Sequence, residues 1–218
     1  MTDYTLEVSG HRWLTGQTVE VRFQRPRGFD FLPGQKVRFV DGKLERDYTL
    51  LGPRDAAELA VCVRHIPEGR FSPRLAESKV GDLFMVTPSF GYFTFNTSPR
   101  RAVFIATGTG IAPFVAYVRD GVHDFDLLHG VRSAEELYYH RELASAARHY
   151  IPCLSNAKLP TDMWPPAFAG HVGQGLQALL PSGAYDFYLC GRGDMIRDVM
   201  GIIDERYEGS HVFNEIFY

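Results

Sequence analysis

The chain has 218 residues and a formal net charge of −3, a length that allows one or two domains with a sizeable buried core. Hydrophobic residues make up 45% and charged residues 22% of the chain, which excludes a disordered or a fibrous protein. The charge offers no basic surface for nucleic acid, and apolar runs such as 102–106 are far shorter than the roughly 20 residues of a membrane span.

Residues 1–97 are predicted to form short strands separated by turns. Runs rich in Val, Leu, Phe, Tyr and Thr predict strands at 5–8, 18–23, 36–40, 48–51, 59–64 and 83–87. Glycine-containing pairs such as Pro33-Gly34 and Gly81-Asp82 lie between the strands and predict turns. Strands at this spacing, with little helix between them, favour an antiparallel barrel or sandwich.

From residue 101 onward, predicted strands alternate with predicted helices. Strands are expected at 102–107, 126–130, 150–154, 185–190 and 212–216, and helices at 113–118, 134–148, 174–180 and 195–207, with a proline-rich loop around 160–166. This alternation predicts a parallel sheet with helices on its faces. The short polar connection at 96–100 is the expected boundary, which gives domains 1–97 and 98–218.

A glycine turn follows the first strand of the second domain. Thr107-Gly108-Thr109-Gly110 leads from that strand into a helix with Pro113 in its first turn. Such a turn lets backbone N–H groups approach a phosphate, and the helix start adds partial positive charge. The glycines are not followed by the Lys of a Walker loop, and Pro113 stands where a dinucleotide fingerprint has its third Gly. Dinucleotide binding and a plain strand–helix turn are equally open on this segment alone.

Three further segments are candidate ligand sites, each with a structural alternative. Cys190-Gly191 ends a parallel strand, where a ligand crevice would lie, although a buried Cys beside a turn is the alternative. Residues 64–75 combine a glycine turn, arginines and a short helix, which suits an anion or a solvated capped helix. Residues 46–49 place a cation, an aromatic ring and a hydroxyl on one strand, which would hold a flat ring with a phosphate tail or lie at the surface.

These segments, in this order, resemble the ferredoxin–NAD(P)+ reductase family of flavoproteins over nearly the whole chain. Arg46-x-Tyr48-Thr49 is similar to the flavin motif of that family, Gly69-x-x-Ser72 to its pyrophosphate turn, and 108–113 to its nicotinamide nucleotide loop. Further similar segments are Gly91-Tyr92-Phe93, 130–133, Cys190-Gly191 and Glu215-Ile216-Phe217. The resemblance implies an antiparallel β-barrel flavin domain at 1–97 and an α/β parallel-sheet nucleotide-binding domain at 98–218.

The resemblance also implies which residues act on the cofactors, FAD and either NADH or NADPH. Thr49 would place its hydroxyl near the flavin atom that accepts hydride, while Cys190 and Glu215 would lie in the nicotinamide pocket. The residues implied to bind the cofactors are Arg46, Tyr48, Thr49, Arg64, Ile66, Gly69, Arg70, Phe71, Ser72, Thr107, Gly108, Thr109, Gly110, Arg132, Ser133, Cys190, Gly191, Met195, Phe217 and Tyr218.

The nucleotide preference depends on a place where the chain departs from the family pattern. NADPH-preferring members often carry Ser-Arg after the third strand, whereas residues 154–158 here contain no Arg. Arg132, Ser133 and Lys158 are still candidates to meet a phosphate, so the sequence leans only slightly to NADH. Phe217 and Tyr218 are both candidates to cover the flavin.

The implied function is hydride transfer between NAD(P)H and FAD, with single electrons passed to or from a separate carrier such as ferredoxin. The three scattered cysteines at 62, 153 and 190 do not supply the four ligands of an iron–sulfur cluster, so the carrier is expected to be another molecule. The alternatives are an NAD(P)H:flavin or quinone reductase for small acceptors, and a non-catalytic flavin-binding subunit of a larger complex.

The histidine spacing and the N-terminal residues set the remaining expectations. The eight His include no His-x-x-x-His pair, so no metal site is expected. The first residues show no signal peptide, and the odd cysteine count does not suit a disulfide framework. A cytoplasmic protein without a membrane span or a nucleic-acid partner is therefore expected, with its oligomeric state open.

Overall fold

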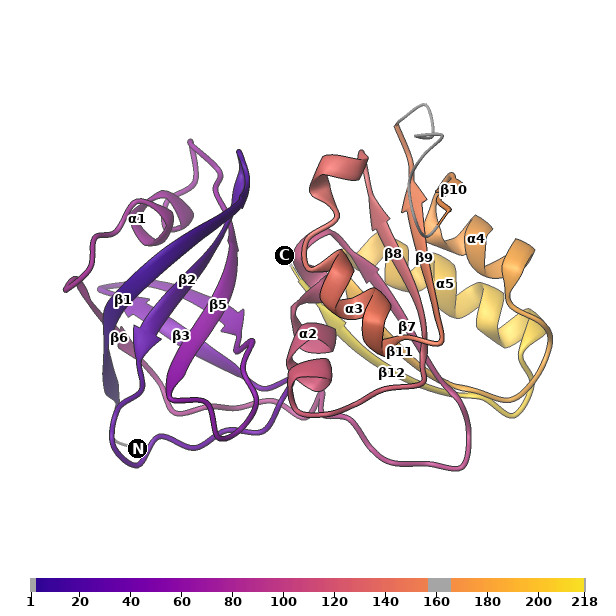
Figure 1. Ribbon diagram of the computed structural model, residues 1–218, viewed down its shortest axis with the longest axis horizontal. Coiled ribbons are helices and arrows are strands. Elements are labelled where there is room, and N and C mark those ends of the chain that lie inside the picture. The colour runs from indigo at the N-terminus through magenta and orange to yellow at the C-terminus, as the bar shows by residue number, and fades with distance from the viewer. Residues whose placement is uncertain (1–2, 157–165, 218) are drawn as a thin grey trace. The chain divides into compact units, whose positions relative to one another are not determined.

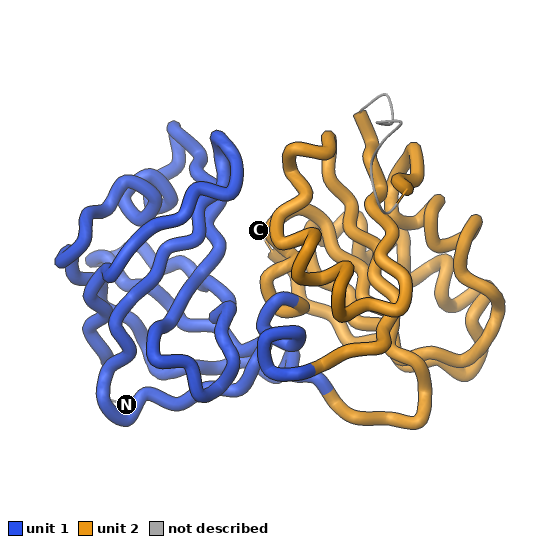
Figure 2. The backbone as a smooth tube through the Cα atoms, viewed as in Figure 1, with its two compact units in different colours: residues 1–95, 115–121 blue, residues 96–114, 122–218 orange. Residues whose placement is uncertain are grey.

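The computed structural model describes residues 3–156 and 166–217, and these contain one antiparallel and one parallel sheet of six strands each (Figure 1). The chain divides into two compact units (Figure 2). The first unit comprises residues 1–95 and 115–121, and the second comprises 96–114 and 122–218.

The first unit is an antiparallel barrel. Its strands, in the sheet order β4-β3-β6-β1-β2-β5, are β4 (Leu44–Thr49), β3 (Lys36–Asp41), β6 (Leu83–Val86), β1 (Tyr4–Thr15), β2 (Thr18–Gln24) and β5 (Glu58–Arg64). An isolated bridge between Leu50 and Val61 joins the two ends of this order, so the sheet closes on itself. The predicted barrel architecture is confirmed, and the short helix α1 (Ser72–Ala76) follows β5.

Strand β1 is longer than the prediction of 5–8 because backbone pairing continues through a polar stretch. Gly10 pairs with Arg22 and Arg12 pairs with Glu20, with irregular register on either side of this segment. The side chains there are polar and lack strand-like alternation, so the sequence pattern ended the strand too early. The ladder to β2 satisfies the backbone groups whatever the side chains are.

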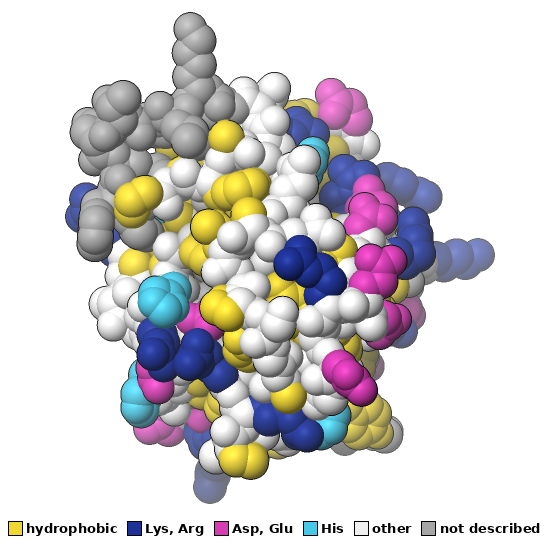
Figure 3. Space-filling view, turned by 90° about the vertical axis from the view of Figure 1, so that its right-hand side faces the viewer, with side chains coloured by type: hydrophobic (Ala, Val, Ile, Leu, Met, Phe, Trp, Pro, Cys, Tyr) yellow, Lys and Arg dark blue, Asp and Glu magenta, His cyan; other side chains and the backbone are white. Residues whose placement is uncertain are grey.

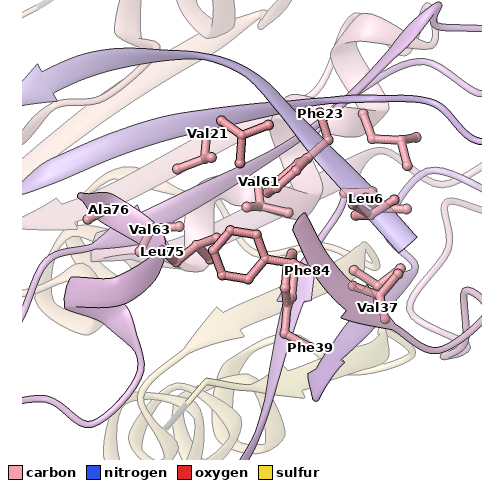
Figure 4. Close-up of a cluster of buried hydrophobic side chains, with 14 of the residues drawn as sticks. Leu6, Val21, Phe23, Val37, Phe39, Val61, Val63, Leu75, Ala76 and Phe84 are labelled. Atoms are coloured by element: carbon pink, nitrogen blue, oxygen red, sulfur yellow. The ribbon is translucent and has the colours of Figure 1, made fainter. Parts of the chain in front are cut away.

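Alternate side chains of the barrel strands point inward and fill its core. Figure 4 shows this cluster, in which Phe23, Phe39 and Phe84 lie among aliphatic residues. The rings of Phe39 and Phe84 pack edge to face with centroids 5.9 Å apart. Leu75 and Ala76 of α1 are buried in the same core, which explains why this short helix is held against the barrel.

The second unit is a parallel sheet with the strand order β10-β9-β8-β7-β11-β12. The strands are β7 (Ala102–Thr107), β8 (Asp126–Val131), β9 (His149–Leu154), β10 (Phe168–Ala169), β11 (Asp186–Gly191) and β12 (His211–Ile216). The helices are η1 (Gly108–Ile111), α2 (Ala112–Arg119), η2 (Ala134–Glu136), α3 (His140–Ala146), α4 (Val172–Leu179) and α5 (Gly193–Arg206). Parallel pairing of these strands confirms the predicted α/β class.

The buried strand β7 supplies apolar side chains to both faces of the parallel sheet. Val103 and Ile105 belong to the core that includes residues of α4 and α5. Between them, Phe104 faces the other way and stacks on Phe114 of α2 with ring centroids 4.6 Å apart. Layers on both faces explain why β7 reads as a continuous apolar run in the sequence.

The helix predicted over 134–148 is interrupted. It is replaced by η2 and α3, and Tyr139 between them has a left-handed φ of 57°. Leu137, Tyr138 and Tyr139 are all buried. Three consecutive residues of one helix point in directions too far apart to share a single core-facing stripe, so burying all three breaks the helix.

Two further observations concern the helices and one face of the molecule. Within residues 3–156 and 166–217, we find no helix long and apolar enough to cross a membrane. On the face drawn in Figure 3, basic and acidic side chains are interspersed, and apolar side chains lie among them.

Candidate functional site

The glycine turn of the second unit lies at the carboxyl end of β7. Gly108 begins the turn η1 with a φ of +53°, a left-handed conformation that side chains rarely adopt. A Cβ atom on Gly110 would collide with the carbonyl oxygen of Cys190 and lie 2.8 Å from the Cα of Gly191. The backbone path therefore requires both glycines, Gly108 for its dihedral angle and Gly110 for its contact with the end of β11.

The end of β11 is built around the same turn. Gly191 has a φ of +146°, and a Cβ atom there would collide with the hydroxyl of Thr107. That hydroxyl accepts a hydrogen bond from the Arg192 N–H at 3.3 Å. The Phe217 N–H donates to the Gly191 carbonyl at 2.8 Å, which extends the pairing past the end of β12. The structure thus brings together predicted site residues from three separate segments.

Two residues predicted to act at the reacting centre are neighbours at this edge. Cys190 on β11 and Glu215 on β12 are paired in register. Cys190 is completely buried, whereas Glu215 is half-buried. Met195, in the first turn of α5, would be 3.1 Å from a Cβ on Gly191. The roles of these residues stay predictions, and Tyr218 lies outside the described residues.

The position of the glycine turn in the sheet is the one where open α/β sheets bind ligands. β7 lies between β8 and β11, and the chain order reverses at β7. Such a topological switch point leaves a crevice outside the carboxyl ends of the strands. The backbone N–H groups of η1 lie at this edge, and N–H groups at the start of a helix are suited to bind an anion.

Arg132 and Ser133, the predicted phosphate contacts after β8, form hydrogen bonds with two carboxylates. The Arg132 backbone N–H donates to Glu136 at 3.0 Å. A hydrogen bond from the Ser133 hydroxyl lowers the pKa of Glu135. The Arg132 side chain is exposed and makes no ion pair with the described residues. Lys158, the third candidate, lies outside the described residues.

His129 was missed by the sequence interpretation and lies directly beside the glycine turn. It is fully buried near the end of β8. Its Nε2 lies 3.3 Å from the Gly108 carbonyl oxygen, and its Nδ1 lies 3.1 Å from the Tyr150 hydroxyl. Burial lowers the pKa of His129 to about 4, so the ring is neutral near pH 7. A single His in an apolar strand gives no sequence signal that distinguishes it from an ordinary core residue.

In the first unit, the predicted flavin motif lies on β4, at the place where β4 and β5 close the barrel with little backbone pairing. Apart from the Leu50–Val61 bridge, the described residues of β4 and β5 form no ladder with each other. Tyr48 is partly buried, with its ring edge-on to Phe39 at 5.5 Å between centroids, and desolvation raises its pKa to about 12. The adjacent Thr49 is buried, and its hydroxyl has no hydrogen-bond partner among the described residues.

The predicted pyrophosphate turn follows β5 and is held by its own hydrogen bonds. The Gly69 N–H donates to the Ile66 carbonyl at 2.7 Å, and the Ser72 hydroxyl accepts from the Ile66 N–H at 3.2 Å. A Cβ on Gly69 would lie 2.8 Å from both of these oxygens. Ser72 therefore braces the turn, while Phe71 is the residue at the N-cap of α1 and its ring belongs to the barrel core.

Three arginines near these two segments make no ion pair within the described residues. Arg46 donates from its side chain only to the neighbouring Glu45 carbonyl, at 2.7 Å. Arg70 is exposed, and Arg64 is half-buried at the end of β5. By contrast, Arg74 in α1 pairs with Asp41. Guanidinium groups without protein carboxylates are available for an anionic ligand.

Sequence comparison identifies relatives of both units. Residues 104–200 match the family described as oxidoreductase NAD-binding domain. The toluate 1,2-dioxygenase electron transfer component of Pseudomonas putida is 30% identical over 90% of this chain and 62% of its own length. The flavodoxin/ferredoxin–NADP reductase of Escherichia coli is 26% identical over 85% of this chain and 88% of its own length. The chain thus spans about three-fifths of the dioxygenase component.

Comparison with solved structures gives the same architecture. A ferredoxin NADP+ reductase from Neisseria gonorrhoeae, solved with bound FAD and NADP, superposes with a TM-score of 0.80 at 21% identity, covering 100% of both chains. The class defined by the fold is an antiparallel barrel unit followed by a parallel-sheet unit. With the sequence matches added, the chain is similar in sequence to dioxygenase electron transfer components and to flavodoxin/ferredoxin–NADP reductases, and its residues 104–200 match the oxidoreductase NAD-binding domain family.

Proposed function

We propose that this chain is a FAD-dependent oxidoreductase that moves hydride between NAD(P)H and FAD and exchanges single electrons with a separate carrier. The observation that carries the proposal is the buried Thr49 hydroxyl without a hydrogen-bond partner among the described residues. Leaving such a group unsatisfied costs about 1–3 kcal/mol, so a ligand that bonds to it recovers that cost. Its place next to Tyr48 suits the polar edge of a flavin ring.

The charges and the turn of the first unit support FAD as its cofactor. Tyr48 would pack against the flavin ring, and Thr49 would donate or accept a hydrogen bond at its polar edge. Arg46 and Arg70, which have no carboxylate partner among the described residues, would neutralise the pyrophosphate, with Arg64, Ile66, Phe71 and the Gly69–Ser72 turn beside it. Bound FAD would supply the conversion between two-electron and one-electron transfer.

The second unit fits the nicotinamide nucleotide. The turn at Thr107–Gly110 would bind its pyrophosphate through backbone N–H groups at the switch point of the sheet. Cys190 and Glu215 would line the nicotinamide side of the crevice, together with Gly191 and Met195. Phe217 or Tyr218 would cover the flavin ring until the nicotinamide replaces it.

We infer NADH as the preferred nucleotide because of the charges around the turn after β8. The hydroxyl of Ser133 is bonded to Glu135, and Glu136 holds the backbone of Arg132. Two carboxylates next to these candidate contacts would repel the additional phosphate of NADPH. The preference is expected to be modest, because the exposed Arg132 side chain still attracts a phosphate.

The proposed partner is a separate one-electron carrier such as ferredoxin, and the proposed compartment is the cytoplasm. The names of the relatives support the first point, since the Pseudomonas putida protein is an electron transfer component and the Escherichia coli protein is a flavodoxin/ferredoxin–NADP reductase. The second point is supported by three free cysteines, all of them buried.

Replacing Arg46 with Ala is expected to weaken FAD binding about tenfold or more, because a charge-assisted contact to the pyrophosphate is lost. The measurement is a fluorescence titration of the flavin-free protein with FAD. Arg27→Ala is the matched control, because Arg27 is an exposed arginine between β2 and β3. Equal FAD affinities for the two variants would contradict the assignment of Arg46, and no FAD binding by the unaltered protein would contradict the proposed function.

A further inference from the structure

The buried contact between His129 and the glycine turn determines where the ring proton lies. The Gly108 carbonyl can only accept a hydrogen bond, so the Nε2 atom 3.3 Å away must carry the proton and donate it. Nδ1 of the neutral ring is then an acceptor, and the Tyr150 hydroxyl at 3.1 Å donates to it. The result is a directed chain of hydrogen bonds from β9 through β8 to the first residue of η1.

The groups that face His129 keep its ring neutral, with the proton on Nε2. Tyr150 is buried, which raises the pKa of its hydroxyl and keeps it protonated as a donor. The ring of Tyr138 lies 6.3 Å away between centroids, and the nearby His140 disfavours a positive charge on His129. His129 is therefore locked in one neutral tautomer under conditions near pH 7.

Fixing the Gly108 carbonyl also fixes the direction of the next N–H group. The peptide between Gly108 and Thr109 is planar and trans, so its C=O and N–H bonds point in opposite directions. His129 holds the carbonyl toward the buried side of the sheet. The Thr109 N–H therefore points away from the core, at the carboxyl edge of β7 where the crevice lies.

We propose that His129 is a positioning residue for nucleotide binding, which holds the Gly108–Thr109 peptide so that the Thr109 N–H faces the pyrophosphate of NAD(P)H. This inference rests on the proposed function, because it takes the glycine turn as the pyrophosphate site. His129 itself does not touch the nucleotide. It acts through the backbone, and Tyr150 acts through His129.

The test measures the affinity for ADP-ribose by calorimetry, a probe that carries the pyrophosphate but no nicotinamide. His129→Phe keeps a ring but removes the donor, so we expect about a tenfold or greater loss of affinity. His129→Gln keeps a side-chain N–H at a similar reach, so we expect recovery to within about threefold of the unaltered protein. Tyr207→Phe is the control, because it removes a buried hydroxyl that bonds to the Leu176 and Leu180 carbonyls at the far end of α4. It should lower the unfolding temperature without changing ADP-ribose affinity.

The outcomes separate this inference from the proposed function. If the unaltered protein does not bind ADP-ribose, both the proposed function and the positioning role of His129 are contradicted. If it binds and folded His129→Phe binds equally well, or if folded His129→Gln binds no better than His129→Phe, only the positioning role is overturned. A measurement on the unaltered protein covers the case in which the variants do not fold. Nitrogen-15 NMR of labelled histidine should show the proton of His129 on Nε2, and a proton on Nδ1 would refute the inference.

Discussion

Gly110→Val is expected to reduce nicotinamide nucleotide affinity by about a hundredfold or more while FAD still binds. The added Cβ would collide with the carbonyl oxygen of Cys190 and lie 2.7 Å from its carbonyl carbon, and both atoms belong to the backbone of β11. The backbone at the end of this buried strand is held by its pairing with β7 and β12, so it cannot move aside as a flexible side chain does. The η1 turn must shift instead, and its N–H groups lose their alignment with the pyrophosphate.

The measurement pairs a calorimetric titration with NAD(P)H analogues and a count of FAD bound per chain. Gly201→Val is the matched control, because Gly201 lies in α5 of the same unit and a Cβ there meets no atom within 4 Å. The control should bind both cofactors normally. Unchanged nucleotide affinity in Gly110→Val would refute the assignment of the glycine turn.

Acidification from about pH 7 to about pH 5 is expected to remove about 2 kcal/mol of the free energy of unfolding through His129 alone. The pKa of His129 is about 4 in the folded protein and close to the ordinary value of about 6.5 in the unfolded chain. Above about pH 6.5 the ring is neutral in both states, and its contribution is fully present. As the pH falls, the unfolded chain takes up a proton that the folded protein cannot, so stability decreases until about pH 4 and then levels off.

Urea unfolding followed by circular dichroism across this pH range measures the effect. Carboxylates also titrate under these conditions, so the informative quantity is the difference between the unaltered protein and His129→Gln, which keeps an N–H donor but has no titrating group. The difference should change by about 2 kcal/mol between the two pH values. A difference independent of pH would contradict the lowered pKa, because it would mean that the ring takes up a proton equally in the folded and unfolded states.

The glycine turn and its strand could be predicted from the sequence because their signals are local. The bounds expected for β7 agree with the structure, since an apolar run that ends in Gly108 and Gly110 specifies a strand and a turn. The close approach of Gly110 to Cys190 could not be read from the sequence, because it joins residues about 80 positions apart. That contact shows why the turn needs a glycine there, beyond its similarity to a family motif.

Features that depend on long-range packing were missed or misjudged. Strand β10 has two residues and is defined by its pairing with β9, so it has no periodicity of its own. The break at Tyr139 follows from burying three adjacent side chains, which outweighs the helical propensity of the segment. His129 gains its place in the site only through contacts with Gly108 and Tyr150 on neighbouring elements.

On β4 of the barrel, too, the local pattern could be predicted from the sequence, whereas the three-dimensional contacts could not. The residues of the flavin motif, Arg46, Tyr48 and Thr49, could be identified because they form a short pattern on one strand. The unsatisfied state of the Thr49 hydroxyl could not, since it depends on which groups reach it in three dimensions. That observation adds physical support to the motif, because a ligand that bonds to the hydroxyl would satisfy it.

The most direct test of the proposed function is an anaerobic titration of the FAD-loaded protein with NADH and, separately, with NADPH. The absorbance of bound flavin at about 450 nm is followed in both titrations. We expect NADH to bleach this band with about one equivalent, and NADPH to do so only at higher concentration. A protein that binds FAD but is bleached by neither nucleotide would contradict hydride transfer at this site.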